Sequence, residues 1–218
     1  MCWLDSFGRF LHYARHHNVQ ATLNRIHVSF KRIRAGNRQV LFFCDLRTCE
    51  ATMPDGPGHT NVERKNAETE LDSHDLQRIV NSWNPKIARQ RLSERFRQGA
   101  SLWLFKLDGH LAAYGWTIIG RTVEPHFFPL GVNDAHLFDY FVFPEFRGRR
   151  INPALVNHIL ACLASERRSR AFIEAAEWNI PQLTSLGRTP FRPFGRARKW
   201  HVFGKILVAW SREGSKAR

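Results

Sequence analysis

Apolar residues along the chain follow two spacings, one typical of strands and one typical of helices. Short, nearly continuous apolar runs predict buried strands. They occur at residues 39–44, 101–107, 111–119, 135–143, 170–177 and 198–210, the last as one long strand or a strand pair. Apolar residues three or four positions apart predict helices at residues 71–83, 85–98, 153–165 and 181–186. This order of elements predicts one α/β domain with a mixed sheet.

Turn and capping residues support three of these boundaries. Asp108-Gly109 separates two apolar runs, which is a strong signal of a β-hairpin. Asp72 or Ser73 can cap the helix that follows. Asn152 predicts another helix start, since Asn caps well and Pro153 suits the first helical position, where the missing amide has no partner to lose.

Residues 1–37 read as a basic helical arm ahead of the main domain. Six Lys and Arg residues oppose a single acid over residues 1–34, and two apolar stripes run there at helical spacing. The stripes are expected to pack on the domain behind them; contact with an anionic membrane through residues 1–34 is the alternative. The main domain then spans residues 38–212, and residues 213–218 form a tail that we expect to be disordered.

The charge of the chain is strongly positive. Thirty-three Lys and Arg residues against 19 Asp and Glu residues give +14 and an isoelectric point near 10.6, which favours polyanionic partners such as nucleic acid, anionic lipid or phosphorylated cofactors. Four cysteines are spaced neither as a disulfide framework nor as a zinc site. With no export signal and no apolar run long enough to span a bilayer, we expect a cytoplasmic protein with reduced thiols.

The segment at residues 143–154, FPEFRGRRINPA, carries the clearest candidate chemistry. It follows a predicted strand and precedes a predicted helix, an arrangement that presents backbone amides and the positive end of a helix dipole to phosphate. Gly148 lets the backbone approach an anion, and three neighbouring arginines add charge. Hydrolase, zincin and P-loop motifs do not occur in the sequence.

This segment resembles the acyl-CoA-binding loop of the GCN5-related N-acetyltransferase (GNAT) superfamily. Val142 and the run at residues 144–147 match the family's strand end and signature, and residues 179–191 resemble its second block. The resemblance implies the acyl-CoA N-acyltransferase fold, a mixed, mostly antiparallel twisted sheet flanked by helices, with acetyl-CoA or another acyl-CoA as co-substrate and no metal. It implies that the cofactor is bound by Phe141, Val142, Arg147, Gly148, Arg149, Arg150, Ile151, Asn152 and Asn179.

The match departs from the family pattern at three positions. Arg150 and Asn152 stand where the signature has small residues, and Gly187 stands where the family often has a Tyr general acid. Arg150 would either crowd the pyrophosphate or pair with it. A catalytically inactive GNAT-like binding protein and a nucleic-acid-binding module are therefore alternatives to an enzyme, the latter less favoured because no common nucleic-acid-binding signature is present.

The resemblance implies direct attack of an acceptor amine on the thioester. A carboxylate or ordered water must then take the ammonium proton, because only the neutral amine is nucleophilic. Asp139 is the first candidate base, since loss of hydration among the aromatic residues around it would raise the pKa of its carboxylate and make it a stronger base. Tyr140 and Glu174 are the other candidate catalytic residues, with Tyr114 and Glu177 as competitors. The acceptor is expected to be a small-molecule or sugar amine, and the excess positive charge suggests that it is anionic.

Overall fold

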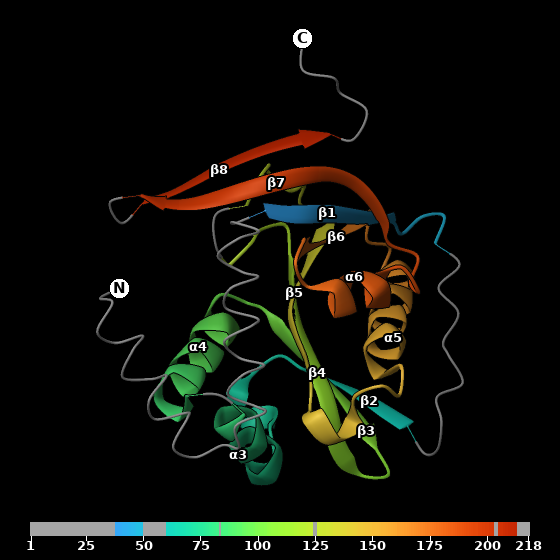
Figure 1. The fold of residues 1–218 in the computed structure, drawn as a ribbon. Coiled ribbons are helices and arrows are strands. Elements are labelled where there is room, and N and C mark those ends of the chain that lie inside the picture. The colour runs from blue at the N-terminus through green and yellow to red at the C-terminus, as the bar shows by residue number, and fades with distance from the viewer. Residues whose placement is uncertain (1–37, 50–59, 83, 124–125, 203–204, 213–218) are drawn as a thin grey trace.

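Eight strands form one twisted sheet in the order β2-β3-β4-β5-β6-β1-β7-β8 (Figure 1). The computed structural model describes residues 38–49, 60–82, 84–123, 126–202 and 205–212; the predicted arm (1–37) and tail (213–218) lie outside them. Every neighbouring pair is antiparallel except β5 and β6. The strands are β1 (Arg38–Asp45), β2 (Thr60–Lys65), β3 (Ser101–Leu107), β4 (His110–Ile119), β5 (Asp134–Val142), β6 (Arg170–Ala176), β7 (Arg192–Val202) and β8 (Lys205–Arg212). The predicted mixed, mostly antiparallel α/β fold is confirmed.

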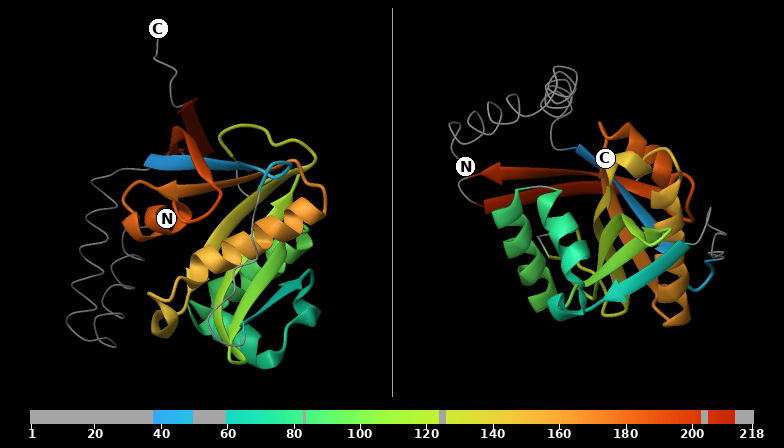
Figure 2. Two further views of the ribbon diagram at one scale, coloured as in Figure 1. Left: turned by 90° about the vertical axis from the view of Figure 1, so that its right-hand side faces the viewer. Right: turned by 90° about the horizontal axis from the view of Figure 1, so that it is seen from below.

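Helices cover both faces of this sheet (Figure 2). The helices α5 (Ile151–Ser165) and α6 (Ile180–Leu186) pack on one face, over a large apolar cluster shared with β1, β3, β5 and β6. The helices α3 (Ser73–Asn81) and α4 (Pro85–Arg97) pack on the other face, over a second apolar cluster. Because both faces are covered, the central strands read as continuous apolar runs rather than as alternating ones.

Local sequence signals predict most of these boundaries. The Asp108-Gly109 turn joins β3 to β4. Asp72 is the N-cap of α3, and its carboxylate accepts a hydrogen bond from the Asp75 backbone amide. The predicted cap at Asn152 is wrong, because α5 begins at Ile151, two residues before the predicted start, and Arg150 stands at its N-cap. Strand β2 was not predicted, since its sequence TNVERK is mostly polar, as suits a strand at the edge of the sheet.

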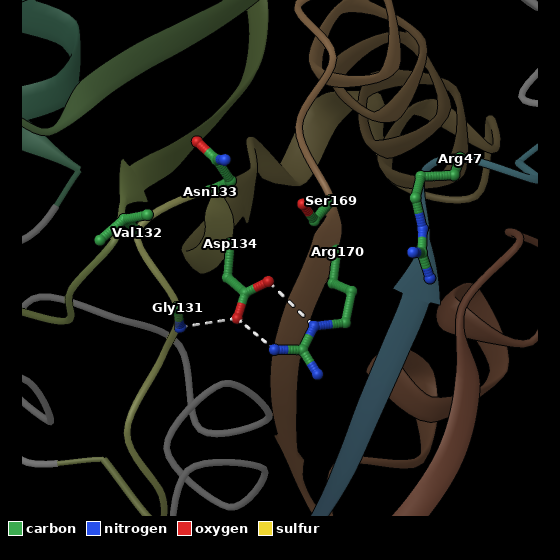
Figure 3. A pocket seen from close by; sticks show the side chains of 7 residues that line it. All are labelled: Arg47, Gly131, Val132, Asn133, Asp134, Ser169 and Arg170. Atoms are coloured by element: carbon green, nitrogen blue, oxygen red, sulfur yellow. Dashed lines mark hydrogen bonds and ion pairs between the residues drawn. The ribbon is translucent and has the colours of Figure 1, made fainter.

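Strands β5 and β6 form a V that opens toward the start of α5. Their parallel pairing joins only residues 134–136 to residues 170–172, and beyond these they part. The closed end is held by Asp134, whose buried carboxylate accepts two bonds from the Arg170 guanidinium, at 2.9 and 2.7 Å, and one from the Gly131 amide (Figure 3). A surface pocket lies around this ion pair. Asp134 and Arg170 are already paired with each other, so we interpret their role there as holding the two strands together.

Candidate active site

A β-bulge in β5 sets the geometry of the open end of the V. Asp139 and Tyr140 together face the single residue Gly115 of β4, and Asp139 has a φ of 49°. The extra residue resets the alternation of side chains, so that Tyr140 packs toward α5 while Phe138 and Phe141 pack toward α4. The bulge thus places chemistry-bearing side chains on both faces of one strand.

Gly115 makes room for this arrangement. A Cβ atom on Gly115 would lie 2.5 Å from the Tyr140 ring, closer than packed atoms can approach. The absence of a side chain at Gly115 therefore leaves the space that the Tyr140 ring occupies beside the bulge.

A cleft of about 530 Å³ lies on the α5 side of the bulge, a volume typical of ligand sites. Its walls come from the end of β5, the loop that follows, the first turn of α5 and the start of α6. Eight of the nine predicted cofactor-binding residues line it: Phe141, Val142, Arg147, Gly148, Arg150, Ile151, Asn152 and Asn179. The sequence motif and the structural cavity therefore coincide.

Arg149 is the ninth predicted residue, and the structure places it outside the cleft. Its guanidinium lies over the Phe146 ring, 5.6 Å from the centroid. Arg147 instead turns inward, donating from Nε to the Val142 carbonyl at 3.2 Å. Neighbouring arginines thus have different roles that their sequence does not distinguish.

The loop backbone has the conformation that the anion-site prediction requires. Gly148 and Arg150 both have left-handed φ values, 80° and 58°. Within the described residues, the amides of Gly148, Arg149 and Arg150 donate to no protein acceptor. Gly148, Arg150 and the first residue of α5 all line the cleft, so backbone donors, the α5 dipole and arginine charges lie on the same side of it.

Asn152 has a different role from the predicted cap. Its Nδ2 donates to Ser185 Oγ at 2.8 Å, which ties the first turn of α5 to α6, while its Oδ1 is buried without a hydrogen bond. The two helices that border the cleft are thereby fixed to each other.

A second pocket, of about 350 Å³, lies on the α4 side of the bulge. Residues of α3 and α4 form one wall, and Tyr114, Trp116 and Asp139 contribute to the other. Tyr140 and Phe141 line both this pocket and the cleft, so the two spaces meet at the bulge.

Asp139 is placed differently from what the sequence predicts. We expected an apolar environment, but the side chain is 56% exposed and its carboxylate pairs with the Arg95 guanidinium. Arg95 in turn lies over the Trp116 and Phe138 rings, at 5.2 and 5.5 Å. The Asp139 carboxylate therefore lies in an exposed ion pair rather than buried among aromatic rings.

The Tyr140 phenol is buried and has no hydrogen-bond partner. Burial raises the pKa of Tyr140 well above its ordinary value. The phenol therefore keeps its proton throughout the physiological pH range.

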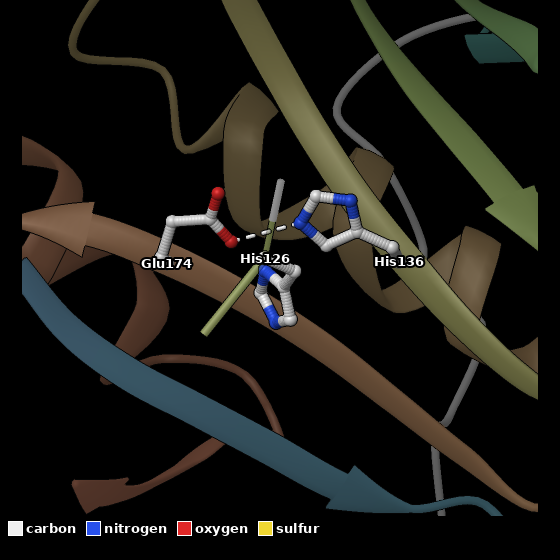
Figure 4. Close-up of side chains that lie close together, drawn as sticks. All are labelled: His126, His136 and Glu174. Carbon is white, nitrogen blue, oxygen red and sulfur yellow. Dashed lines mark hydrogen bonds and ion pairs between the residues drawn. The ribbon is translucent and has the colours of Figure 1, made fainter. Parts of the chain in front are cut away.

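Glu174, the third predicted catalytic residue, lies apart from the other two in a cluster with two histidines (Figure 4). Its Oε2 is 2.8 Å from His136 Nε2, and His126 completes the group. Burial alone would raise the pKa of Glu174, but the adjacent His136 lowers it below the ordinary value by charge and hydrogen bonding. Burial lowers the pKa of His126 to about 4. Of the predicted competitors, Glu177 pairs with Arg196 at 3.0 Å.

Sequence reasoning missed Arg95, Gly115, His126 and His136. Arg95 is one of several arginines on its helix, and Gly115 reads as an ordinary residue within an apolar strand. The two histidines are ten residues apart, with no local spacing that indicates a shared site. Only the sheet brings them to Glu174.

The sequence profile of the Acetyltransferase (GNAT) family matches residues 66–183, which is more than half of the chain. The chain therefore belongs to the GNAT acetyltransferase family, as the resemblance predicts. The matched region runs from before α3 to the start of α6, and it includes most of the residues that line the cleft and the second pocket. Among curated proteins no sequence matches the chain.

Solved structures show the same fold. A tandem GNAT protein from the clavulanic acid biosynthesis pathway superposes with a TM-score of 0.55 at 16% identity, over 83% of this chain and 55% of that one. A GNAT-family acetyltransferase from Colwellia psychrerythraea gives a TM-score of 0.52 at 10% identity, over 80% and 55%. This chain thus spans just over half the length of these proteins. No helix among the described residues is both long and apolar enough to cross a membrane.

Proposed function

We propose that this protein is an N-acyltransferase that moves an acetyl group from acetyl-CoA to the amine of a small acceptor. The observation that carries the proposal is the cleft of about 530 Å³ at the open end of the V, bordered by the basic loop and the start of α5. Coenzyme A has a pyrophosphate and a long neutral arm. The cleft offers free amides and arginines at one corner and the separated strands β5 and β6 leading away from it.

The pyrophosphate fits the loop at residues 147–152. The loop has two left-handed residues and backbone amides that are unpaired within the described part of the chain, and Arg147, Arg150 and Arg188 line the cleft. Anions bind well where backbone donors, a helix dipole and guanidinium groups converge. The pantetheine arm would then follow the edge of β5 near Val142 toward the bulge, where cleft and pocket meet.

The acceptor fits the pocket on the α4 side. Transfer requires the amine nitrogen to bond to the thioester carbonyl carbon as the carbon–sulfur bond breaks, with loss of a proton from nitrogen and gain of one by sulfur. Asp139, which lines this pocket, is our first candidate to take the amine proton. Tyr140 lines both spaces, and this position makes it our candidate to protonate the departing thiolate. Glu174 is the second candidate base.

The class of acceptor follows from charge. The chain carries +14, more than one cofactor requires, and two arginines of α4, Arg91 and Arg95, line the acceptor pocket. We therefore propose an amine that also carries an anionic group, such as a phosphorylated or nucleotide-linked amino sugar. A cytoplasmic location is part of the same proposal.

Matched arginine variants test the donor site. Arg147→Ala removes a cleft arginine, and Arg149→Ala makes the same change outside the cleft. We expect Arg147→Ala to weaken CoA binding about 10- to 150-fold, or about 1.5–3 kcal/mol, and Arg149→Ala to change it less than about twofold. Isothermal titration with CoA measures both.

The outcome of this titration decides the proposal in two ways. Absence of CoA binding by the wild type refutes the acyltransferase function, and equal effects of the two variants refute the placement of the pyrophosphate. Mass spectrometry of a panel of amines incubated with acetyl-CoA then separates an active enzyme, which yields acetylated product, from a binding protein, which yields none.

A further inference from the structure

The cluster of His126, His136 and Glu174 is assembled from three separate segments. His126 lies in the segment between β4 and β5, His136 on β5 and Glu174 on β6. His136 is in the last residue pair before β5 and β6 separate, so the cluster lies at the closed end of the V. Figure 4 shows the three polar groups pointing toward one another.

The donor atoms are close enough to share one ion. All three lie within 4.8 Å of one another, and the His136 Nε2 and Glu174 Oε2 atoms are 2.8 Å apart. Ligand atoms in a tetrahedral zinc site lie about 3.3 Å apart, as follows from metal–ligand bonds of about 2.0–2.2 Å. The separations in this cluster bracket that value. His126, which belongs to neither a helix nor a strand, is the ligand best able to adjust.

Aromatic rings lie against both imidazoles of the cluster. The rings of Phe128 and Phe138 lie within 5.4 Å of the two imidazoles, centroid to centroid. An apolar shell of this kind strengthens the interaction of a carboxylate with a metal ion. The Glu174 side chain remains 20% exposed, which leaves one side of the cluster open to solvent.

Two imidazoles and one carboxylate with an open side are a recurrent ligand set for divalent transition metals. We propose that His126, His136 and Glu174 bind one such ion, with zinc as the best match, and that a water molecule or substrate group takes the fourth position. None of the three ligands is among the described residues that line the cleft or the acceptor pocket, so the metal proposal does not rest on the donor site. Glu174 is the one residue it shares with the proposed mechanism, where it is the second candidate base.

Metal titration of conservative variants of the full chain tests the site. Chelator-treated wild type is titrated with Zn²⁺ by calorimetry and with Co²⁺, whose visible absorption reports ligand geometry. We expect one tight equivalent, weakened about 100-fold or more in both His126→Gln and Glu174→Gln. His110→Gln, an exposed histidine of the β3–β4 hairpin, and Glu177→Gln, near the end of β6, are the matched controls and should titrate as the wild type does.

Thermal unfolding with and without Zn²⁺ gives a second readout and shows that each variant folds. Zinc should raise the melting temperature of the wild type and of both controls, and of neither site variant. A tight equivalent that persists in His126→Gln and Glu174→Gln would place the metal elsewhere, for example at the histidines of residues 1–37, and overturn the proposal. Absence of any site tighter than about 100 μM in the wild type would overturn it as well.

Discussion

The two cavities on either side of strand β5 are built in different ways. The cleft on the α5 side, our proposed donor site, is formed largely by consecutive residues, from Tyr140 through the loop to Pro153, and by the short helix α6. The pocket on the α4 side, our proposed acceptor site, is formed by residues of α3, α4, β4 and β5, which are separated by up to about sixty residues in the chain. The cleft therefore depends mostly on one local segment, and the pocket depends on the packing of distant elements.

This difference predicts that the two cavities respond differently to substitution. A loop that offers backbone amides tolerates changes such as Arg150 and Asn152, because the amides do not depend on side-chain identity. A pocket made of side chains changes with each substitution. Variants on the two sides should therefore separate acceptor chemistry from donor binding.

The largest effect is expected on the acceptor side, at Asp139. Asp139→Asn removes the candidate base while keeping the shape and the left-handed conformation, which Asn tolerates. Turnover of an amine found by the mass-spectrometric screen should fall about 10²- to 10⁴-fold, whereas CoA affinity should stay unchanged. Steady-state kinetics and CoA titration measure the two quantities.

Asp108→Asn is the matched control for this variant. Asp108 is also exposed and has nearly the same φ, 50° against 49°, but lies in the β3–β4 turn. Its turnover should equal that of the wild type. If Asp139→Asn were equally active, Asp139 would not be the base, and Glu174 would take its place in the mechanism.

A smaller effect is expected at the junction of the two cavities, at Gly115. In Gly115→Ala the new methyl group meets the Tyr140 ring at 2.5 Å, so either the ring or the bulge must move. We expect a loss of about 1–3 kcal/mol in the free energy of unfolding, measured with urea, together with lower turnover.

Gly187→Ala provides the comparison, since its new methyl group would meet only carbonyl oxygens at 3.6 Å, an ordinary contact. Its free energy of unfolding should change by less than about 0.5 kcal/mol. Similar losses of unfolding free energy in Gly115→Ala and Gly187→Ala would show that the contact with the Tyr140 ring is not the cause of the destabilisation.

The smallest effect is expected on the donor side, at Arg150. Its left-handed φ of 58° strains any residue with a Cβ atom, so Arg150→Gly should raise the free energy of unfolding by about 0.5–1 kcal/mol. Arg149→Gly removes the same charge at a residue without a positive φ, so it should not raise the free energy of unfolding. A loss of stability in Arg150→Gly would mean that contacts of the Arg150 side chain outweigh the strain.

Local sequence alone determined the order of elements apart from β2, the hairpin at Asp108-Gly109, the α3 cap at Asp72 and the basic loop before α5. These features depend on residues close together in the chain, whose spacing is visible directly. Even there, the cap of α5 was placed two residues too late, because Asn152 forms its hydrogen bond with Ser185, more than thirty residues away. A cap is decided by competition with partners that local sequence does not show.

Only the tertiary structure decided which side chains meet. The pairing of Asp139 with Arg95, the room that Gly115 leaves for Tyr140 and the approach of His126 and His136 to Glu174 all join residues on separate strands, helices or loops. Each depends on sheet register, and a single inserted residue at the bulge reverses which face the following side chains occupy. Sequence spacing specifies the strands, but the contacts between them depend on how the whole sheet pairs and packs.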